Sequence, residues 1–251
     1  LNKIVFKKKQ ELKKIKEKYP LEKIKAKAKK GKTRNFFKAL NKAPYSIIAE
    51  IKKASPTEGV IVKRFSPSIL ARVYEKAGAD AISVLTEEKF FLGNLDNIQK
   101  VKSASRIPVL RKDFIFDEYQ IYESKVSGAD AVLLILRILE RRQFERLFFL
   151  AKKLGLDVLV EIYDRKDLSK LKIKADIIGI NTRDLKTGKI NFEKTGKLIK
   201  EINSQICVCE SGVGNKSHID EMKKIGFNCF LVGTSILRSK DKVHFIRSLL
   251  K

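Results

Sequence analysis

The strongest constraint on the fold of this chain is a series of eight short apolar runs separated by amphipathic segments. Each run is rich in isoleucine, valine or leucine, and successive runs begin about 19 to 35 residues apart, the size of a βα unit. The predicted strands are SIIAEI (46–51), AISVLT (81–86), IPVLRK (107–112), AVLLIL (131–136), DVLVEI (157–162), DIIGIN (176–181), ICVCES (206–211) and CFLVG (229–233).

Helical patterns fill the intervals between these strands, for example at residues 66–79, 117–129, 139–155 and 215–226. Several of them end in glycine just before the next strand, as helix C-terminal caps do. Eight βα units in roughly 205 residues predict an α/β fold of the closed (β/α)₈ TIM barrel type rather than an open doubly wound sheet. An open sheet usually carries a glycine-rich dinucleotide-binding motif after an early strand, and the sequence has none.

The residues before the first strand predict an added helical segment. We expect residues 1–45 to form an N-terminal helical extension and residues 46–251 to form the catalytic barrel. Leu12, Ile15 and Tyr19 share one apolar stripe, which Pro20 ends, and NFFKAL (35–40) suggests a second amphipathic turn. The extension could cover one end of the barrel or be a frayed basic arm, and the apolar stripe favours the first.

The formal charge of +26 requires nucleic acid and anionic surfaces to be considered as partners. Residues 1–45 hold 17 Lys and Arg against 3 Glu, a net +14, which leaves +12 for the other 206 residues. The sequence has no arginine-rich run and no aromatic stacking motif, so nucleic-acid binding is disfavoured. A solvated, lysine-rich surface is the simpler interpretation, and its positive potential would favour a phosphorylated substrate.

Other classes of protein are also disfavoured by the sequence. Its longest apolar runs are far shorter than the roughly 20 residues of a membrane-spanning helix, so no membrane association is expected. The first residues lack the apolar stretch of a secretory signal, which makes a cytoplasmic location the default expectation. Cys207, Cys209 and Cys229 are predicted to be reduced core thiols, because they are too few for a disulfide framework. A monomer is expected.

Polar side chains gather at the C-terminal ends of five predicted strands, where TIM barrels place their active sites. They are Glu50 and Lys52, Lys112, Glu161, Asn181 and Arg183, and Glu210 and Ser211. Because strand side chains alternate, partners two positions apart, such as Glu50 and Lys52, are predicted to share the interior face. Any one of them could belong to a rim ion pair, but five coincident strand ends predict a site.

The residue types at this predicted site suit proton transfer. Burial lowers the pKa of a lysine while nearby carboxylates oppose the fall, so Lys52 or Lys112 could act as an acid. A metal is not expected, because His218 and His244 lie in helical segments and the lysines would repel a cation. Gly212, Gly214 and Gly233 follow the last two strands, where backbone amides could hold a phosphate or simply form tight turns.

Taken together, eight motifs in order resemble the indole-3-glycerol phosphate synthase family over about residues 47 to 236. The motifs are IIAEIKKASPTEG, SVLTEEKFFLG, VLRKDFI, GADAVLLI, LVEI, GINTRDL, ESGV and LVGTSI. The resemblance implies conversion of 1-(2-carboxyphenylamino)-1-deoxyribulose 5-phosphate to indole-3-glycerol phosphate, carbon dioxide and water, with no metal and no organic cofactor. It is poorest over residues 1–45.

The resemblance also implies a role for each matched residue. Lys112 would be the general acid that protonates the substrate ketone. Glu50, Lys52 and Glu161 would handle later proton transfers and orient the carboxylated ring. The residues implied to bind the rest of the substrate are Ser55, Phe91, Phe114, Leu133, Asn181, Arg183, Glu210 and Ser211, with Gly212, Gly233 and Thr234 near the phosphate.

Two alternatives remain open on the sequence. The same barrel could catalyse another reaction, such as isomerisation of a neighbouring phosphoribosyl compound or a Schiff-base aldol cleavage, which needs a lysine that forms a covalent adduct. Residues 1–45 could instead bind nucleic acid, with the steep salt dependence of counterion release.

Overall fold

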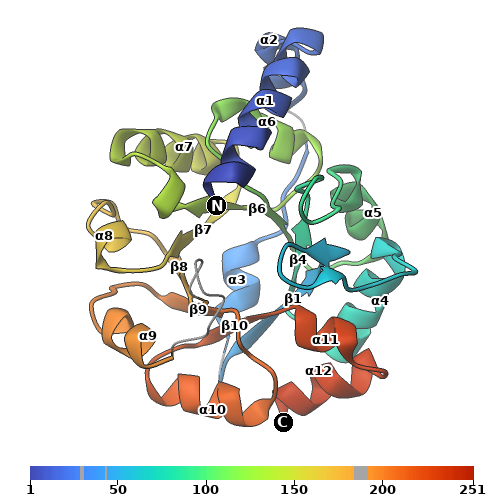
Figure 1. Cartoon of the computed structure of the whole chain (residues 1–251), viewed down its shortest axis with the longest axis vertical. Helices are drawn as coiled ribbons and strands as arrows, with labels where there is room; N and C mark the ends of the chain where they lie inside the picture. The colour runs from blue at the N-terminus through green and yellow to red at the C-terminus, as the bar shows by residue number, and fades with distance from the viewer. Residues whose placement is uncertain (29–30, 43, 184–191) are drawn as a thin grey trace.

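The computed structural model confirms the predicted barrel and describes residues 1–28, 31–42, 44–183 and 192–251. Eight parallel strands close in the order β1-β10-β9-β8-β7-β6-β5-β4, and Figure 1 shows helices around them. The barrel strands are β1 (Ser46–Ile51), β4 (Ala81–Leu85), β5 (Val109–Lys112), β6 (Ala131–Ile135), β7 (Asp157–Ile162), β8 (Ile177–Asn181), β9 (Ile206–Glu210) and β10 (Cys229–Val232). Each lies within a run predicted from the sequence.

Helices follow the strands and form the outer layer. The described ones are α4 (Pro67–Ala77), α5 (Asp96–Ala104), α6 (Glu118–Val126), η1 (Leu136–Ile138), α7 (Arg141–Lys153), α8 (Arg165–Leu168), α9 (Phe192–Ile199), α10 (Lys216–Lys224), α11 (Thr234–Arg238) and α12 (Lys242–Leu250). A short antiparallel hairpin, β2 (Ala54–Ser55) with β3 (Gly59–Val60), follows β1.

Local sequence sets where these helices begin and end. The Asp117 carboxylate accepts a hydrogen bond from the Tyr119 amide at the start of α6, and Gln120 completes a capping box. Gly78 ends α4 with φ of +98°, a left-handed conformation that suits a residue without a β-carbon. Such caps return the chain to the next strand within a few residues.

Alternation along each strand divides the core into two layers. Inside the barrel lie Ile48, Ala81, Leu110, Ala131, Leu133, Ile135, Leu159, Ile177, Ile206, Val208, Cys229 and Leu231. Between the strands and the helices lie Cys207 and Cys209, as predicted. All three cysteines are free and buried, which confirms that they are core thiols, and burial raises the pKa of Cys207 to about 11.

Three helices precede the barrel: α1 (Asn2–Lys18), α2 (Leu21–Ala28) and α3 (Phe36–Leu40). Phe36 and Leu40 of α3 are buried among the interior residues of the barrel, and the Phe37 amide donates to Asp157 at the start of β7. Helix α3 therefore lies at the N-terminal ends of the strands and packs against the barrel interior. The predicted stripe on α1 is only partly correct, because Leu12 is buried whereas Ile15 is 40% exposed.

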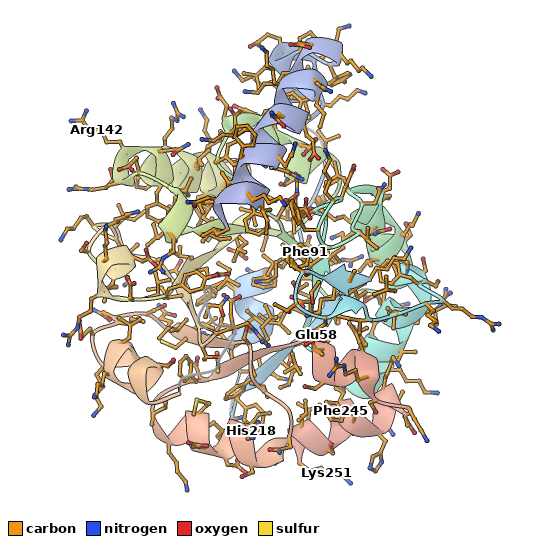
Figure 2. The ribbon with its side chains drawn as sticks, in the orientation of Figure 1. Glu58, Phe91, Arg142, His218, Phe245 and Lys251 are labelled. Atoms are coloured by element: carbon orange, nitrogen blue, oxygen red, sulfur yellow. The ribbon has the colours of Figure 1, made fainter. Side chains whose placement is uncertain are left out.

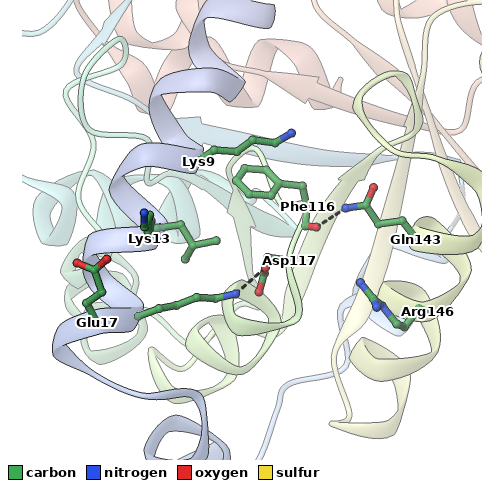
Figure 3. A pocket seen from close by; sticks show the side chains of 9 residues that line it. Lys9, Lys13, Glu17, Phe116, Asp117, Gln143 and Arg146 are labelled. Atoms are coloured by element: carbon green, nitrogen blue, oxygen red, sulfur yellow. Dashed lines mark hydrogen bonds and ion pairs between the residues drawn. The ribbon is translucent and has the colours of Figure 1, made fainter.

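Helix α1 lies along the other side of the molecule and is joined to the barrel by ion pairs. Lys8 lies 3.0 Å from Asp113, which directly follows β5, and Lys16 lies 2.7 Å from Asp117. Figure 3 shows the open groove beside α1, which is lined by Leu12 and Phe116 and by exposed charged side chains. None of the predicted site residues lines this groove. No helix in the described ranges combines the length and apolar character needed to cross a bilayer.

Candidate active site

A pocket of about 550 Å³ opens at the C-terminal ends of the barrel strands. Of the candidates from the sequence, Gly214 does not line the pocket. The predicted site residues that do line it are Glu50, Lys52, Ser55, Phe91, Lys112, Phe114, Leu133, Glu161, Asn181, Arg183, Glu210, Ser211, Gly212, Gly233 and Thr234. These residues come from all eight barrel strands or the segments that follow them, which is where a parallel barrel concentrates its functional groups. Their grouping follows from the parallel barrel, which brings the C-terminal ends of its strands to one rim.

Lys112 lies at the centre of the charged part of the pocket. Its Nζ donates to Glu210 Oε2 at 2.7 Å and lies 3.4 Å from Glu161 Oε2. Both carboxylates are almost fully buried. Burial alone would lower the pKa of Lys112, but the carboxylates, above all Glu210 and Glu161, raise it above its ordinary value. The lysine is therefore held as a cation with its proton directed at carboxylate oxygens.

Glu210 shares Lys112 with a second carboxylate, that of Glu161. Burial raises the pKa of Glu210 to about 8; Lys112 opposes the rise, whereas Glu161 adds to it. Glu210 Oε1 is also a buried oxygen without a hydrogen-bond partner among the described residues. This carboxyl group can therefore exchange a proton near neutral pH.

Glu50 and Lys52 form a second pair on the inner face of β1 and just beyond it. Glu50 Oε1 lies 2.8 Å from Lys52 Nζ. Burial would raise the pKa of Glu50, but Lys52 and Lys112 hold it below its ordinary value. The pocket thus contains one carboxylate that stays ionised and another that titrates near neutral pH, an arrangement that separates acid and base roles.

Two glycines leave room for these carboxylates. A β-carbon on Gly179 of β8 would lie 2.1 Å from Glu210 Oε1, and one on Gly233 would lie 2.4 Å from Glu50 Oε1. Neither position could accept a side chain without moving the carboxylate. Gly233 was predicted to bind phosphate, and the structure shows that it also makes space for Glu50.

Asn181 connects the carboxylate cluster to the edge of the pocket. Its Nδ2 donates to Glu161 Oε1 at 3.2 Å and to the Tyr163 hydroxyl at 3.1 Å, while its Oδ1 accepts from the Arg183 amide at 3.1 Å. All three polar contacts agree with one orientation of the amide. Asn181 is therefore positioned to restrain Glu161.

The segment after β9 carries local backbone strain. Ser211 has φ of +71° and Gly212 has φ of +83°, so a residue with a side chain occupies the left-handed region beside the pocket. The Thr182 hydroxyl donates to the carbonyl oxygens of Glu210 and Ser211, at 3.1 and 3.0 Å. These bonds hold the strained turn and fix where Glu210 enters the pocket.

The predicted apolar walls are formed mainly by Phe91 and Phe114, whose ring centroids lie 6.3 Å apart at an angle of 39°. Leu133 adds an interior aliphatic surface from β6. Figure 2 shows Phe91 and Glu58 near the centre of the view, with Glu58 in the turn between β2 and β3. The apolar surface formed by Phe91, Phe114 and Leu133 suits a planar aromatic ring.

Sequence reasoning missed several lining residues. Tyr163 stands two residues after Glu161, and continuing the period of two past the end of β7 would have found it. Leu1, which precedes α1, and Ile4 of α1 also line the pocket, and no local signal in the sequence indicates this long-range packing. Within the described ranges, no group of three or more histidine, cysteine, aspartate or glutamate side chains is arranged to hold a metal ion.

The fold and site together define an enzyme of the TIM-barrel class, with its candidate active site where the strands end. Residues 1–249 match the family model for indole-3-glycerol phosphate synthase, and the chain belongs to that family. The family predicted from the sequence motifs is thereby confirmed.

Individual relatives agree with this assignment. The chain is 46% identical over 255 residues to the indole-3-glycerol phosphate synthase of Thermoanaerobacter pseudethanolicus, covering 100% of this chain and 97% of the relative. It is 48% identical over 206 residues to that of Campylobacter jejuni strain 81116, covering 81% and 80% of the two chains.

Two solved structures support the fold alone, because their sequence identities are low. The thiamine phosphate pyrophosphorylase of Pyrococcus furiosus has a TM-score of 0.61 and 16% identity, covering 86% of this chain and 96% of its own. The 3-hexulose-6-phosphate synthase of Salmonella typhimurium has a TM-score of 0.62 and 15% identity, covering 81% and 96%. Both confirm the barrel architecture.

Proposed function

We propose that this pocket closes the indole ring of 1-(2-carboxyphenylamino)-1-deoxyribulose 5-phosphate by acid and base catalysis from its own side chains. The family assignment supports a decarboxylating lyase of tryptophan biosynthesis as the class of enzyme. The products are indole-3-glycerol phosphate, carbon dioxide and water. The proposal adds which residues act and that they act without metal or organic cofactor.

Lys112 is the proposed general acid. As the aromatic carbon attacks the substrate ketone and the new carbon–carbon bond forms, the ketone oxygen becomes a hydroxyl by taking a proton from the Lys112 ammonium group. The carboxylates around Lys112 raise its pKa, so the lysine is protonated at neutral pH and has a proton to donate. Glu210, 2.7 Å away and titrating near neutral pH, is placed to return a proton.

Later steps remove the ring carboxyl group as carbon dioxide, then a ring proton and the hydroxyl group as water. We assign these proton transfers and the orientation of the ring to Glu50, Lys52 and Glu161. Glu50 remains ionised in its pair with Lys52, which suits a base that accepts the departing proton. The aromatic walls, Phe91 and Phe114, would hold the carboxylated ring.

The phosphate is proposed to bind at the other side of the mouth, where several small residues line the pocket. Gly212, Gly233 and Thr234 supply backbone amides and a hydroxyl group, and Ser55 and Arg183 lie on the same pocket lining. The segment after β9 is held in place by His218, whose Nδ1 accepts a hydrogen bond from the Gly214 amide at 3.2 Å.

The position of Lys112 between Glu210 and Glu161 is the single observation that carries the proposal. It also disfavours the Schiff-base alternative, because a nucleophilic lysine needs a lowered pKa. The direct test is to incubate the purified protein with the carboxyphenylamino substrate in a buffer treated with a chelator and to follow indole fluorescence. Absence of product from a well-folded sample would refute the proposal.

A monomeric state and a cytoplasmic location stay predictions. The net charge of +26 supports the first, because like charges oppose self-association. Light scattering on an eluting size-exclusion peak would measure the mass directly, and a mass of two chains at micromolar concentration would contradict the monomer.

A further inference from the structure

Tyr163 lines the pocket, and the reaction scheme gives it no role. It follows β7 on the same face as Glu161, and its hydroxyl oxygen accepts a hydrogen bond from Asn181 Nδ2 at 3.1 Å. The same amide nitrogen donates to Glu161 Oε1 at 3.2 Å. Tyr163 and Glu161 therefore share the two amide hydrogens of a single side chain.

The tyrosine is itself held firmly from outside the pocket. Its backbone amide donates to Asp167 Oδ2 at 3.0 Å, and Asp167 is buried. The Arg137 guanidinium lies over its ring, 4.8 Å from the centroid, and forms ion pairs with Asp164 and Asp167. The hydroxyl oxygen thus has a fixed position, set by the segment between β7 and α8.

The hydroxyl group also stays neutral under ordinary conditions. Burial raises the pKa of Tyr163, and the negative charge of Glu161 raises it further. A neutral hydroxyl can accept the amide hydrogen of Asn181 without adding a further negative charge beside Glu161. Its contribution is therefore geometric rather than a proton donated to the substrate.

We propose that Tyr163 is a positioning residue, which fixes the Asn181 amide and, through it, the Glu161 carboxylate that faces Lys112. The inference rests on the proposed function, in which Glu161 transfers protons and Asn181 lines the pocket. Without the tyrosine hydroxyl, one amide hydrogen of Asn181 loses its acceptor and the amide can rotate. Glu161 then loses its restraint on the side away from Lys112.

The test is a double-mutant cycle on the full chain with the carboxyphenylamino substrate. Tyr163→Phe keeps the ring under Arg137 and removes only the hydroxyl group. We expect kcat to fall about five- to tenfold, the effect of losing one neutral hydrogen bond, while KM changes less than about twofold. Because Tyr163 acts through Asn181, the Tyr163→Phe/Asn181→Ala double variant should be no slower than Asn181→Ala alone.

The matched control removes another tyrosine hydroxyl. Tyr45 donates a buried hydrogen bond to the Leu249 carbonyl at 2.6 Å, and it does not line the pocket. Tyr45→Phe should lower the denaturation midpoint and leave kcat unchanged. A Tyr163→Phe variant that loses the same stability without losing turnover would show a merely structural role and would overturn the proposal.

Two further outcomes separate this inference from the proposed function. If Asn181→Ala and Tyr163→Phe each lower kcat but their effects multiply in the double variant, Tyr163 does not act through Asn181 and only the inference fails. If Asn181→Ala and Glu161→Gln both retain full turnover, the proposed roles of those residues fail, and the inference fails with them.

Discussion

The Glu210 carboxylate occupies the space that a side chain on Gly179 would fill. They lie on the neighbouring strands β8 and β9, where Gly179 pairs with Val208 and Glu210 lies two residues further along β9. A β-carbon added to Gly179 would lie 2.1 Å from Glu210 Oε1. A glycine within a barrel strand is thus explained by the carboxylate beside it, whose other oxygen lies 2.7 Å from Lys112 Nζ. The pocket's charge arrangement depends on a residue with no functional group.

Replacement of this glycine should therefore damage the site. Gly179→Ala would push Glu210 away from Lys112, and overpacking of this kind costs about 1 to 3 kcal/mol of unfolding free energy. We expect lower turnover together with lower stability in urea denaturation. Gly196→Ala on α9 is the control, because its nearest neighbour would be Ile225 at an ordinary 3.4 Å. Equal behaviour of the two variants would contradict this account of Gly179.

Removal of the proposed acid should have the largest effect on catalysis. Lys112→Ala should lower turnover by about a hundred- to ten-thousandfold, the usual contribution of a general acid. The folded state should persist, as judged by circular dichroism, although Glu210 and Glu161 lose their shared cation. Lys100→Ala, at an exposed position on α5, provides the control in the same fluorescence assay. Near-normal turnover of Lys112→Ala would remove Lys112 from the acid role.

Glu210 predicts a definite dependence of stability on pH. Its pKa in the folded protein is about 8, above the ordinary value of 4.5, so the native state binds more protons than the unfolded state between these values. Its contribution to the free energy of unfolding should therefore decrease as pH rises from about 5 to 8, by at most about 1.4 kcal/mol per pH unit. Urea denaturation of wild type and Glu210→Gln should show this slope in their difference. A constant difference would argue against the assigned shift.

Asp113 predicts the opposite behaviour at acid pH. Burial would raise its pKa, but Lys8 and Arg111 hold it at about 2, below the ordinary 3.8. Its contribution to stability is present above about pH 4 and is lost as pH falls toward 2, by about 2 kcal/mol in total. Asp113→Asn should be less stable at neutral pH but lose less stability over this acid range. Asp96→Asn, at an exposed position on α5, is the control, and an acid dependence of Asp113→Asn equal to that of wild type would contradict the prediction.

The contact of α3 with the barrel interior can be tested by truncating a buried side chain. Leu40 is 1% exposed and packs with the interior residues, so Leu40→Ala should cost about 2 to 5 kcal/mol of unfolding free energy. Exposed Leu92→Ala should change stability little. A single cooperative denaturation transition is expected for both variants, and a separate early transition for Leu40→Ala would show that the extension unfolds independently.

The sequence predicted the barrel well because its signals are local. Apolar runs with a period of two located β1 to within its observed ends, and the rule that barrel sites lie at strand C-termini brought Lys112 and Glu161 into one pocket. Tyr163 was missed because its position lies beyond the apolar run. Leu1 reaches the pocket only through the packing of α1, and Gly179 gains its importance from a neighbouring strand; neither relationship has a local pattern.

Because α3 closes one end of the barrel, it limits how substrate can reach the pocket and how product can leave it. Phe36 and Leu40 fill the end opposite the catalytic groups, so in the described part of the chain the reactants cannot pass through the barrel as through a tube. We expect substrate to enter and product to leave at the opposite rim, beside Leu1 and Ile4. Product must therefore leave the pocket before the next substrate molecule can bind. Accumulated product should compete directly with substrate.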